Sequence, residues 1–186
     1  MTIGFALCGS FCTYAQVFPV MKALARDHKL IPILSPASAG TDTRFGQAQE
    51  FTRQLTELCG AAPLTTLQEV EPIGPKKLLD VLVIAPCTGN TLAKLSHGIA
   101  DNAVTMAAKS HLRNGRPVVV GISTNDALAA AAENIGRLLA RKHYYFVPFG
   151  QDDAIQKPNS MVADFRQLPA TIAAAAEGQQ LQPLLL

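Results

Sequence analysis

The residues LDVLVIAPCTGNT, at positions 79–91, decide the fold. Residues 79–85 are apolar apart from one aspartate, and they show no alternation between apolar and polar positions. Such a run predicts a strand that is buried on both faces, as strands of a parallel sheet are. Pro86 lacks a backbone donor, so we expect the strand to end there. The polar turn that follows is expected to lead into a helix at about residue 91.

The same succession of buried strand, polar turn and helix recurs along the chain. Apolar runs predict further strands at 3–8, 30–34, 117–122 and 144–147, and a weaker one near 62–64. Helical spacing of apolar residues predicts helices at 13–27, 47–58, 91–97, 102–113, 127–141 and 169–177. Residues 35–46 and 148–161 are interpreted as loops. We therefore expect one α/β domain over residues 1–186, a three-layer α/β/α arrangement around a doubly wound, wholly parallel sheet of five to six strands.

The composition excludes several classes of protein. With 186 residues, 48% of them apolar, the chain can bury a sizeable core and is not a disordered polypeptide. Its 16 Lys and Arg residues against 14 Asp and Glu residues argue against binding nucleic acid by bulk charge. Charged residues make up 16%, below the typical value of about 25%. From this low charge we expect part of the surface to be covered in a homo-oligomer.

Targeting and redox signals point to a cytoplasmic protein. No apolar run approaches the ~18 residues of a membrane helix. The N-terminal apolar run has no cation before Lys22, unlike a signal peptide. The four cysteines, Cys8, Cys12, Cys59 and Cys87, show neither C-x-x-C nor zinc spacing. We expect reduced thiols and no metal site.

In a doubly wound sheet, ligands bind beyond the carboxyl ends of the strands. That rule selects the turns at 9–13, 35–46, 86–91 and 122–127, together with the loop after the last strand. The residues in these turns that we expect to contact a ligand are Gly9, Ser10, Ser35, Thr88, Gly89, Asn90, Thr91, Ser123, Thr124 and Asn125.

These turns suit a planar ligand that carries one phosphate. Gly9 allows close approach, Ser10 supplies a hydroxyl, and the helix that follows supplies free N–H groups. The hydroxyls and amide around Gly89 suit the edge of a flat ring. A mononucleotide such as FMN fits, whereas the G-x-G-x-x-G pattern of a dinucleotide site is absent. Two alternatives stay open: the first turn is an ordinary strand–helix turn, or Thr88 or Asn90 only caps a helix.

The arginine, histidine and cysteine residues give weaker evidence about a ligand site. Arg44 lies in the second loop, where it either binds a carboxylate through both guanidinium nitrogens or is a solvated surface residue. The four histidines lie in or beside helices or before a strand, and we expect packing or surface roles for them. Cys8 and Cys87 end strands that are expected to be neighbours. They form either a redox pair or, as we prefer, two buried thiols.

Several segments are similar to a known family. The segment APCTGNTLAKLSHGIADN, at 85–102, resembles the flavin-contacting segment of the FMN-dependent cysteine decarboxylase-like flavoproteins. Within that family, further segments resemble the B subunits of dipicolinate synthases. They are GSFCTYAQVFP at 9–19, TRFG at 43–46, PIGPKKLLD at 72–80, RPVVVGISTNDAL at 116–128 and PFGQDDAIQKPNSMVA at 148–163. The resemblance extends over nearly the whole chain.

The resemblance implies a Rossmann-like flavoprotein fold, bound FMN and a homo-oligomer made of trimers. It also implies a partner, the A subunit of dipicolinate synthase, expected to use NADP. Together the two subunits would convert dihydrodipicolinate, or its hydroxytetrahydro precursor, to dipicolinate in the mother cell of a sporulating bacterium. Residue by residue, Gly9 and Ser10 match the phosphate turn, Ser35 the hydroxyl after the second strand, and Thr88, Asn90 and Thr91 the flavin-contacting loop.

The chain departs from the decarboxylases at one motif. Their Pro-x-Met-Asn signature is replaced by GISTND at 121–126, and no histidine stands where their catalytic base would be. The resemblance implies instead an oxidoreductase subunit, and in it we expect Arg44 and Lys157 to face a dicarboxylate and Asp152 or Asp153 to accept a proton. The alternatives are a non-catalytic subunit that presents the ligand, or an FMN-dependent decarboxylase or prenyltransferase-like protein.

Overall fold

A computed structural model describes residues 1–186 and shows seven strands in one sheet. The order across the sheet is β2-β1-β3-β4-β7-β6, and β5 lies beside the first half of β4. The strands are β1 (Thr2–Leu7), β2 (Lys29–Leu34), β3 (Val81–Cys87), β4 (Val118–Thr124), β5 (Tyr144–Phe146), β6 (Phe149–Asp153) and β7 (Lys157–Ala163).

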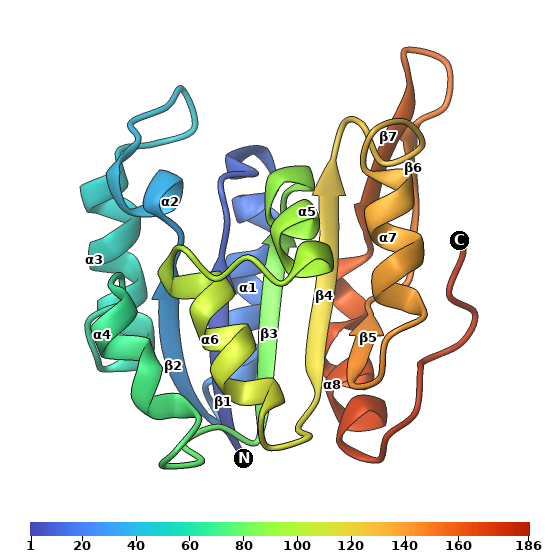
Figure 1. The fold of residues 1–186 in the computed structure, drawn as a ribbon. Helices are drawn as coiled ribbons and strands as arrows, with labels where there is room; N and C mark the ends of the chain where they lie inside the picture. Colours follow the sequence, from blue (N-terminus) through green and yellow to red (C-terminus); the bar gives the residue numbers. More distant parts are fainter.

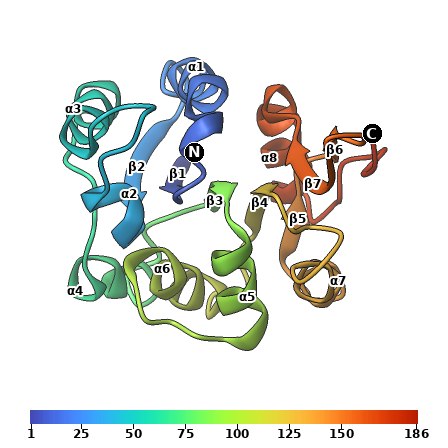
Figure 2. The ribbon, with the colours of Figure 1, turned by 90° about the horizontal axis from the view of Figure 1, so that it is seen from above.

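Strands β1 to β5 are parallel, as the unbroken apolar runs predict. All seven residues of β3 are buried, because helices cover both faces of the sheet. On one face lie α1 (Tyr14–Leu24), α3 (Ala48–Cys59) and α8 (Leu168–Ala176). On the other face lie α4 (Leu67–Val70), α5 (Gly89–His97), α6 (Ala103–Leu112) and α7 (Ala132–Leu139), as Figure 2 shows. The predicted three-layer α/β/α fold is confirmed.

The prediction of a wholly parallel sheet of five to six strands is wrong at its far end, where two antiparallel strands bring the total to seven. Residues 148–161, interpreted from the sequence as a loop, contain β6 and the start of β7, which form an antiparallel hairpin. Strand β7 also pairs antiparallel with β4, through Ser123 with Val162 and Thr124 with Met161. Because β5 ends beside Val120, the last residues of β4 are free to pair with this hairpin. Figure 1 shows the hairpin standing above the sheet at the carboxyl ends of the strands.

Several predicted boundaries shift. Strand β3 runs through Pro86 to Cys87, with an irregularity in its pairing to β4 beyond Ile84. The weak strand near 62–64 is only a single bridge between Leu64 and Ile33. The loop at 35–46 contains a short helix, α2 (Pro36–Gly40). The helix predicted at 127–141 begins only at Ala132, because residues 125–131 form turns.

The core is one continuous cluster of 46 buried apolar residues that includes both sides of the sheet. Its largest members, among them Phe5, Phe146 and Phe165, are fully buried. No helix reaches the length and apolarity that crossing a bilayer requires. The sheet places the carboxyl ends of β1, β3 and β4 side by side. The polar turns begin at these strand ends.

Candidate functional site

Two adjoining hollows lie at the carboxyl ends of the parallel strands, and we call them together the cleft. The first, of about 580 Å³, is lined by the turn after β1, the end of β4 and the β6–β7 hairpin. The second, of about 480 Å³, lies between the start of α2 and the start of α5. Gly9 and Thr88 line both hollows, so the two are contiguous. Their sizes are within the range of small-molecule sites, about 300–1,000 Å³.

The turn after β1 is tied to the end of β4. The Ser10 hydroxyl donates to the backbone carbonyl of Ser123 at 2.6 Å. The Thr13 hydroxyl donates to the Ser10 carbonyl at 2.9 Å and lies 3.5 Å from the Ser123 hydroxyl. Thr13 directly precedes α1, but its side chain makes no capping hydrogen bond and instead holds this turn. The hydroxyls of Ser10 and Ser123 thereby come within one small region of the cleft.

The start of α5 presents unpaired backbone donors to the second hollow. The Thr88 hydroxyl caps the helix by accepting from the backbone N–H of Thr91 at 3.3 Å. The N–H group of Asn90, a residue that lines the second hollow, is in the first turn and has no partner within the helix. The cap that the sequence left open as an alternative is therefore real. It does not exclude ligand binding, because the free N–H group of Asn90 and the positive end of the helix dipole lie at the hollow.

A buried hydroxyl network lies behind the second hollow. The Ser35 and Ser38 hydroxyls are 3.0 Å apart, and Ser38 donates to the carbonyl of Leu7 at 3.0 Å. Tyr14 donates to Ser38 at 2.9 Å. Burial raises the pKa of Tyr14 well above its ordinary value, so this phenol stays a neutral donor. Since the hydrogen of Ser38 is directed to Leu7, the Ser35 hydroxyl can turn its own hydrogen toward Ser38 or toward a ligand.

Cys8 and Cys87 are both buried free thiols, as expected. Burial raises the pKa of Cys8 to about 11, and the Thr91 hydroxyl donates to its sulfur at 3.3 Å. Burial also raises the pKa of Cys87. Neither thiol is ionised at neutral pH, so neither is a ready nucleophile. They pack as small apolar side chains beneath the cleft.

Gly89 is required by its neighbours in the protein rather than by a ligand. A Cβ atom at this position would lie 2.7 Å from Asp126 Oδ1 and 2.8 Å from Thr124 Oγ1. Thr124 donates to Asp126 at 2.5 Å, so the turn after β4 is braced against the start of α5. Gly89 does not itself line either hollow. Close contact between two turns, not close approach of a flat ring, explains this glycine.

The cleft carries little net charge, because its charged side chains occur as pairs. Lys157 donates to Asp152 at 2.8 Å in the first hollow, and Lys94 to Asp101 at 2.7 Å in the second. The Asp152 carboxylate raises the pKa of Lys157 and lowers its availability to other anions. An anionic ligand in the cleft would therefore be held mainly by hydroxyl and N–H donors.

The comparisons with known proteins agree with this arrangement. A family model described as Flavoprotein matches residues 1–164.

The chain belongs to the Flavoprotein family.

Two relatives cover this flavoprotein almost completely. The dipicolinate synthase B subunit of Bacillus subtilis (strain 168) is 47% identical over 185 residues, which make up 99% of this chain and 92% of the relative. The crystal structure of the dipicolinate synthase B subunit from Bacillus halodurans C is also 47% identical. It superposes with a TM-score of 0.91 over 100% of this chain and 95% of that one. The resemblance inferred from the sequence is confirmed.

More distant structures share the fold. The FMN-dependent cysteine decarboxylase SpaF is 24% identical, with a TM-score of 0.68 over 95% of this chain and 97% of that one. The flavin prenyltransferase UbiX of Deinococcus radiodurans matches only a short segment, 46% identical over 39 residues, 21% of this chain and 20% of that one. The mostly parallel sheet of this flavoprotein thus has the Rossmann-like architecture of that decarboxylase structure.

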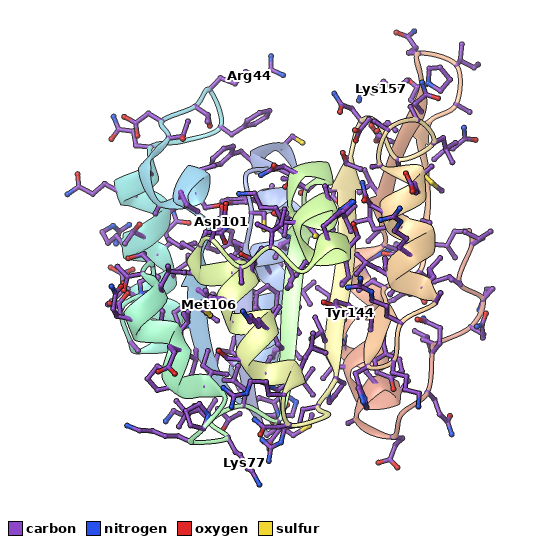
Figure 3. The ribbon with its side chains drawn as sticks, in the orientation of Figure 1. Arg44, Lys77, Asp101, Met106, Tyr144 and Lys157 are labelled. Carbon is purple, nitrogen blue, oxygen red and sulfur yellow. The ribbon has the colours of Figure 1, made fainter.

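Most of the predicted contacts of this flavoprotein converge. The cleft is lined by nearly all of them: Gly9, Ser10, Ser35, Thr88, Asn90, Thr91, Ser123, Thr124, Asn125, Asp152 and Lys157. Arg44, Gly89 and Asp153 are the predicted site residues that do not line the cleft. The guanidinium of Arg44 lies 4.9 Å from the centre of the Phe45 ring and is exposed, although its neighbours Thr43 and Phe45 line the cleft. Figure 3 shows Arg44 and Lys157 on two separate loops at the same end of the molecule.

Sequence reasoning missed several cleft residues of this flavoprotein. They are Phe11, Cys12, Phe45, Val162, Lys94, Asp101 and Asn102. Phe45 had a usable signal, because an aromatic residue on a polar, glycine-containing loop is rarely there for packing, and it is 47% exposed. Val162 lacked a signal, since its place depends on the hairpin, whereas Ser160 belongs to the polar loop after the last strand that the sequence selects. None of the four histidines lines the cleft.

Proposed function

We propose that this chain is the flavin-binding subunit of an oxidative synthase that converts a dihydrodipicolinate, or its hydroxytetrahydro precursor, to the aromatic dipicolinate. One observation carries the proposal: hydroxyl and N–H donors from three neighbouring strand ends meet in one cleft that has no free acid or base. Such a site is suited to holding a flat cofactor with one phosphate. It is poorly suited to hydrolysis or to acyl transfer, which need an activated nucleophile.

The residues of the cleft fit FMN. The Ser35 hydroxyl and the N–H group of Asn90 at the start of α5 would hold the phosphate from the second hollow, where Lys94 pairs with the Asp101 carboxylate. The turn of Gly9 and Ser10 would lie against the phosphate, and the bond from the Ser10 hydroxyl to the Ser123 carbonyl keeps that turn in place. Thr88, Asn90 and Asn125 would meet the polar edge of the ring system. When bound, FMN supplies a two-electron acceptor for the removal of hydrogen from the substrate. The protein supplies binding and orientation.

The substrate side of the cleft is formed by the two flanking loops. Lys157 on the hairpin and Arg44 on the 41–46 loop would bind the two carboxylates of the substrate. Arg44 would have to leave its position over Phe45 to do so. Asp152 is the carboxylate at the cleft that would accept a proton. The hydrogen bond that it accepts from Lys157 would break when a substrate carboxylate binds Lys157 instead.

The remaining context is part of the same proposal. The NADP-using A subunit of dipicolinate synthase would be the partner, and the assembly would contain several copies of this chain. A distant relative with the same fold, a UbiX-like decarboxylase, is described as dodecameric. The proposed location is the cytoplasm of the mother cell in a spore-forming bacterium.

A second function is worth testing because of a specific observation. Asp152, the one carboxylate that lines the first hollow, is bound to Lys157 and is not free. A protein without a free base could present or shield the dicarboxylate while the A subunit carries out the oxidation. The chemistry of the two alternatives differs in whether this chain's own flavin becomes reduced.

The test uses the purified chain alone. FMN is titrated into the protein, the precursor is then added without the A subunit and without oxygen, and the flavin band at about 450 nm is followed. Saturable binding of one FMN per chain, followed by bleaching of the band, supports the proposed function. A stable flavin spectrum, in a chain that still stimulates the A subunit, supports the presenting role. Failure of FMN to bind at all would contradict the flavin-binding proposal.

A further inference from the structure

A second hollow of the molecule lies away from the cleft, on the face covered by α5, α6 and α7, and we call it the groove. It has a volume of about 590 Å³ and runs between α6 and the connection from α7 to β5. Its floor is apolar and includes Leu95, Leu112 and Tyr144. Figure 3 places Tyr144 well below Arg44 and Lys157, the labelled residues of the two loops that flank the cleft. The proposed function makes no use of the groove.

The rim of the groove is positively charged. Lys109, Arg113, Arg141 and Lys142 line it, and no aspartate or glutamate does. Arg141 donates to the carbonyls of Leu95 and Ser96, at the end of α5. The other three cations have no ion pair within the chain. An apolar hollow with a rim of like charges is typical of a site that an anionic partner covers.

The tip of the β6–β7 hairpin has the complementary character. Ile155 is 91% exposed, more than any other large apolar side chain of the protein. The Asp153 carboxylate accepts the backbone N–H groups of Ile155 and Gln156, at 3.1 and 2.9 Å, which fixes the turn. Asp152 is neutralised by Lys157, so Asp153 leaves the tip with an uncompensated negative charge. The tip is thus an ordered apolar side chain beside one carboxylate.

The tip cannot fill the groove of its own chain. None of its residues lines that groove, and Figure 1 shows the hairpin standing at the opposite end of the sheet from the β5 end of α7. We propose that the hairpin tip of one copy of this chain inserts into the groove of a second copy. Ile155 would lie on the apolar floor near Leu112, and Asp153 would face Lys109 and Lys142 on the rim. This contact extends the homo-oligomeric state proposed above and does not involve the flavin.

Such a contact would determine how the copies of the chain assemble. Tip and groove are different surfaces of one chain, so the contact is head-to-tail, and a ring closes when each copy gives one tip and receives another. A tip alone is smaller than the total of about 1,200–2,000 Å² that stable interfaces bury. Two further exposed side chains would enlarge the buried surface: Ile99, which lines the groove and is 48% exposed, and Leu128, which is 49% exposed and whose N–H donates to Asn159 of β7.

The experiment measures the mass of the full chain in solution, by light scattering and sedimentation. The two test variants are Ile155→Asp, which alters the tip, and Lys109→Glu with Arg113→Glu, which alters the groove. The matched control is Lys22→Glu with Arg26→Glu, a pair of cations on and just after α1 that also lack an ion pair. All of these side chains are at least partly exposed, so thermal unfolding is expected to stay as in the wild type. We expect the control to assemble normally and each test variant to be monomeric.

Mixing the two test variants distinguishes this contact from any other interface. The tip variant keeps an intact groove, and the groove variant keeps an intact tip, so an equimolar mixture should form dimers through one remaining contact. Rising salt should weaken that dimer, because an exposed charge pair is screened. The proposal is overturned if the wild type is monomeric, if either variant keeps the wild-type mass, or if the mixture stays monomeric. Since no flavin is needed, these outcomes are separate from those that test the proposed function.

Discussion

The Ser10 hydroxyl donates a 2.6 Å hydrogen bond to the backbone carbonyl of Ser123, which lies 113 residues further along the chain. This bond joins the turn after β1 to the end of β4 across the carboxyl end of β3, which separates the two strands in the sheet. The strands bring the two turns near each other, and the bond holds the first hollow of the cleft in shape.

Replacing Ser10 with Ala should affect both stability and flavin binding. The Ser123 carbonyl loses its partner, so the free energy of unfolding in urea should fall by about 1 kcal/mol. Affinity for FMN should fall about tenfold, equivalent to ~1.4 kcal/mol. Thr56→Ala is the control, because the Thr56 hydroxyl bonds only within α3, away from the cleft. Equal flavin affinity in Ser10→Ala and the control would show that Ser10 does not contribute to flavin binding.

Replacing Arg44 with Ala should weaken dicarboxylate binding by about tenfold without loss of flavin, because one exposed charge-assisted contact is removed. Arg44→Lys should recover only part of the affinity, since an ammonium lacks the planar fork of a guanidinium. Calorimetry with dipicolinate and the flavin content of the purified variants measure the two effects. Loss of bound flavin with unchanged dicarboxylate affinity would show that Arg44 serves the cofactor instead.

Asp152→Asn and Lys157→Met should have opposite effects on dicarboxylate binding. Without the Asp152 carboxylate, Lys157 keeps its charge and loses its competing partner, so binding should tighten by about two- to fivefold, a modest gain because the pair is exposed. Without Lys157, binding should weaken. If Asp152 accepts a proton in the reaction, Asp152→Asn also slows turnover while binding tightens. Weaker binding in both variants would mean that the ion pair only maintains the hairpin.

Gly89→Ala should destabilise the protein and disturb the cleft. The added methyl group would overlap Asp126 and Thr124, and relieving such an overlap costs about 1–3 kcal/mol. Gly136→Ala, in α7, is the matched control, because nothing lies within 4 Å of an added Cβ there. That control should be neutral or more stable by up to about 1 kcal/mol, as alanine is the better helix former. Chemical unfolding of the two variants compares them directly.

Stability should depend on the protonation of His111. Burial lowers the pKa of this fully buried imidazole from 6.5 to about 4, and one of its ring nitrogens contacts the Pro117 carbonyl at 3.0 Å. Between these two values the unfolded chain binds the proton and the folded chain does not. The stabilisation is therefore complete above pH 6.5 and is lost as the pH falls toward 4.

The expected loss is about 2.5 kcal/mol at about pH 4.5 relative to neutral pH. Urea unfolding at the two pH values measures it. His111→Gln, which can still donate to the Pro117 carbonyl but does not titrate, should lose less stability over the same interval. An identical pH dependence in the variant would assign the acid sensitivity to other groups.

The sequence by itself was enough for the layered fold and for most of the cleft. Apolar runs such as that of β3 specify strands covered on both faces, and the polar residues after them necessarily meet at one end of a parallel sheet. Ser10, Ser35, Thr88 and Ser123 could be selected in this way, because their place depends only on strand direction.

Only the tertiary structure decided the rest. The β6–β7 hairpin forms because β5 is short and leaves the end of β4 unpaired, and no local pattern at 148–161 reveals that vacancy. The direction of Arg44, the pairing of Lys157 with Asp152 and the reason for Gly89 depend on contacts between loops distant in sequence. Local periodicity reports which faces of a segment are buried. It carries no information on which side chains from other segments lie beside it.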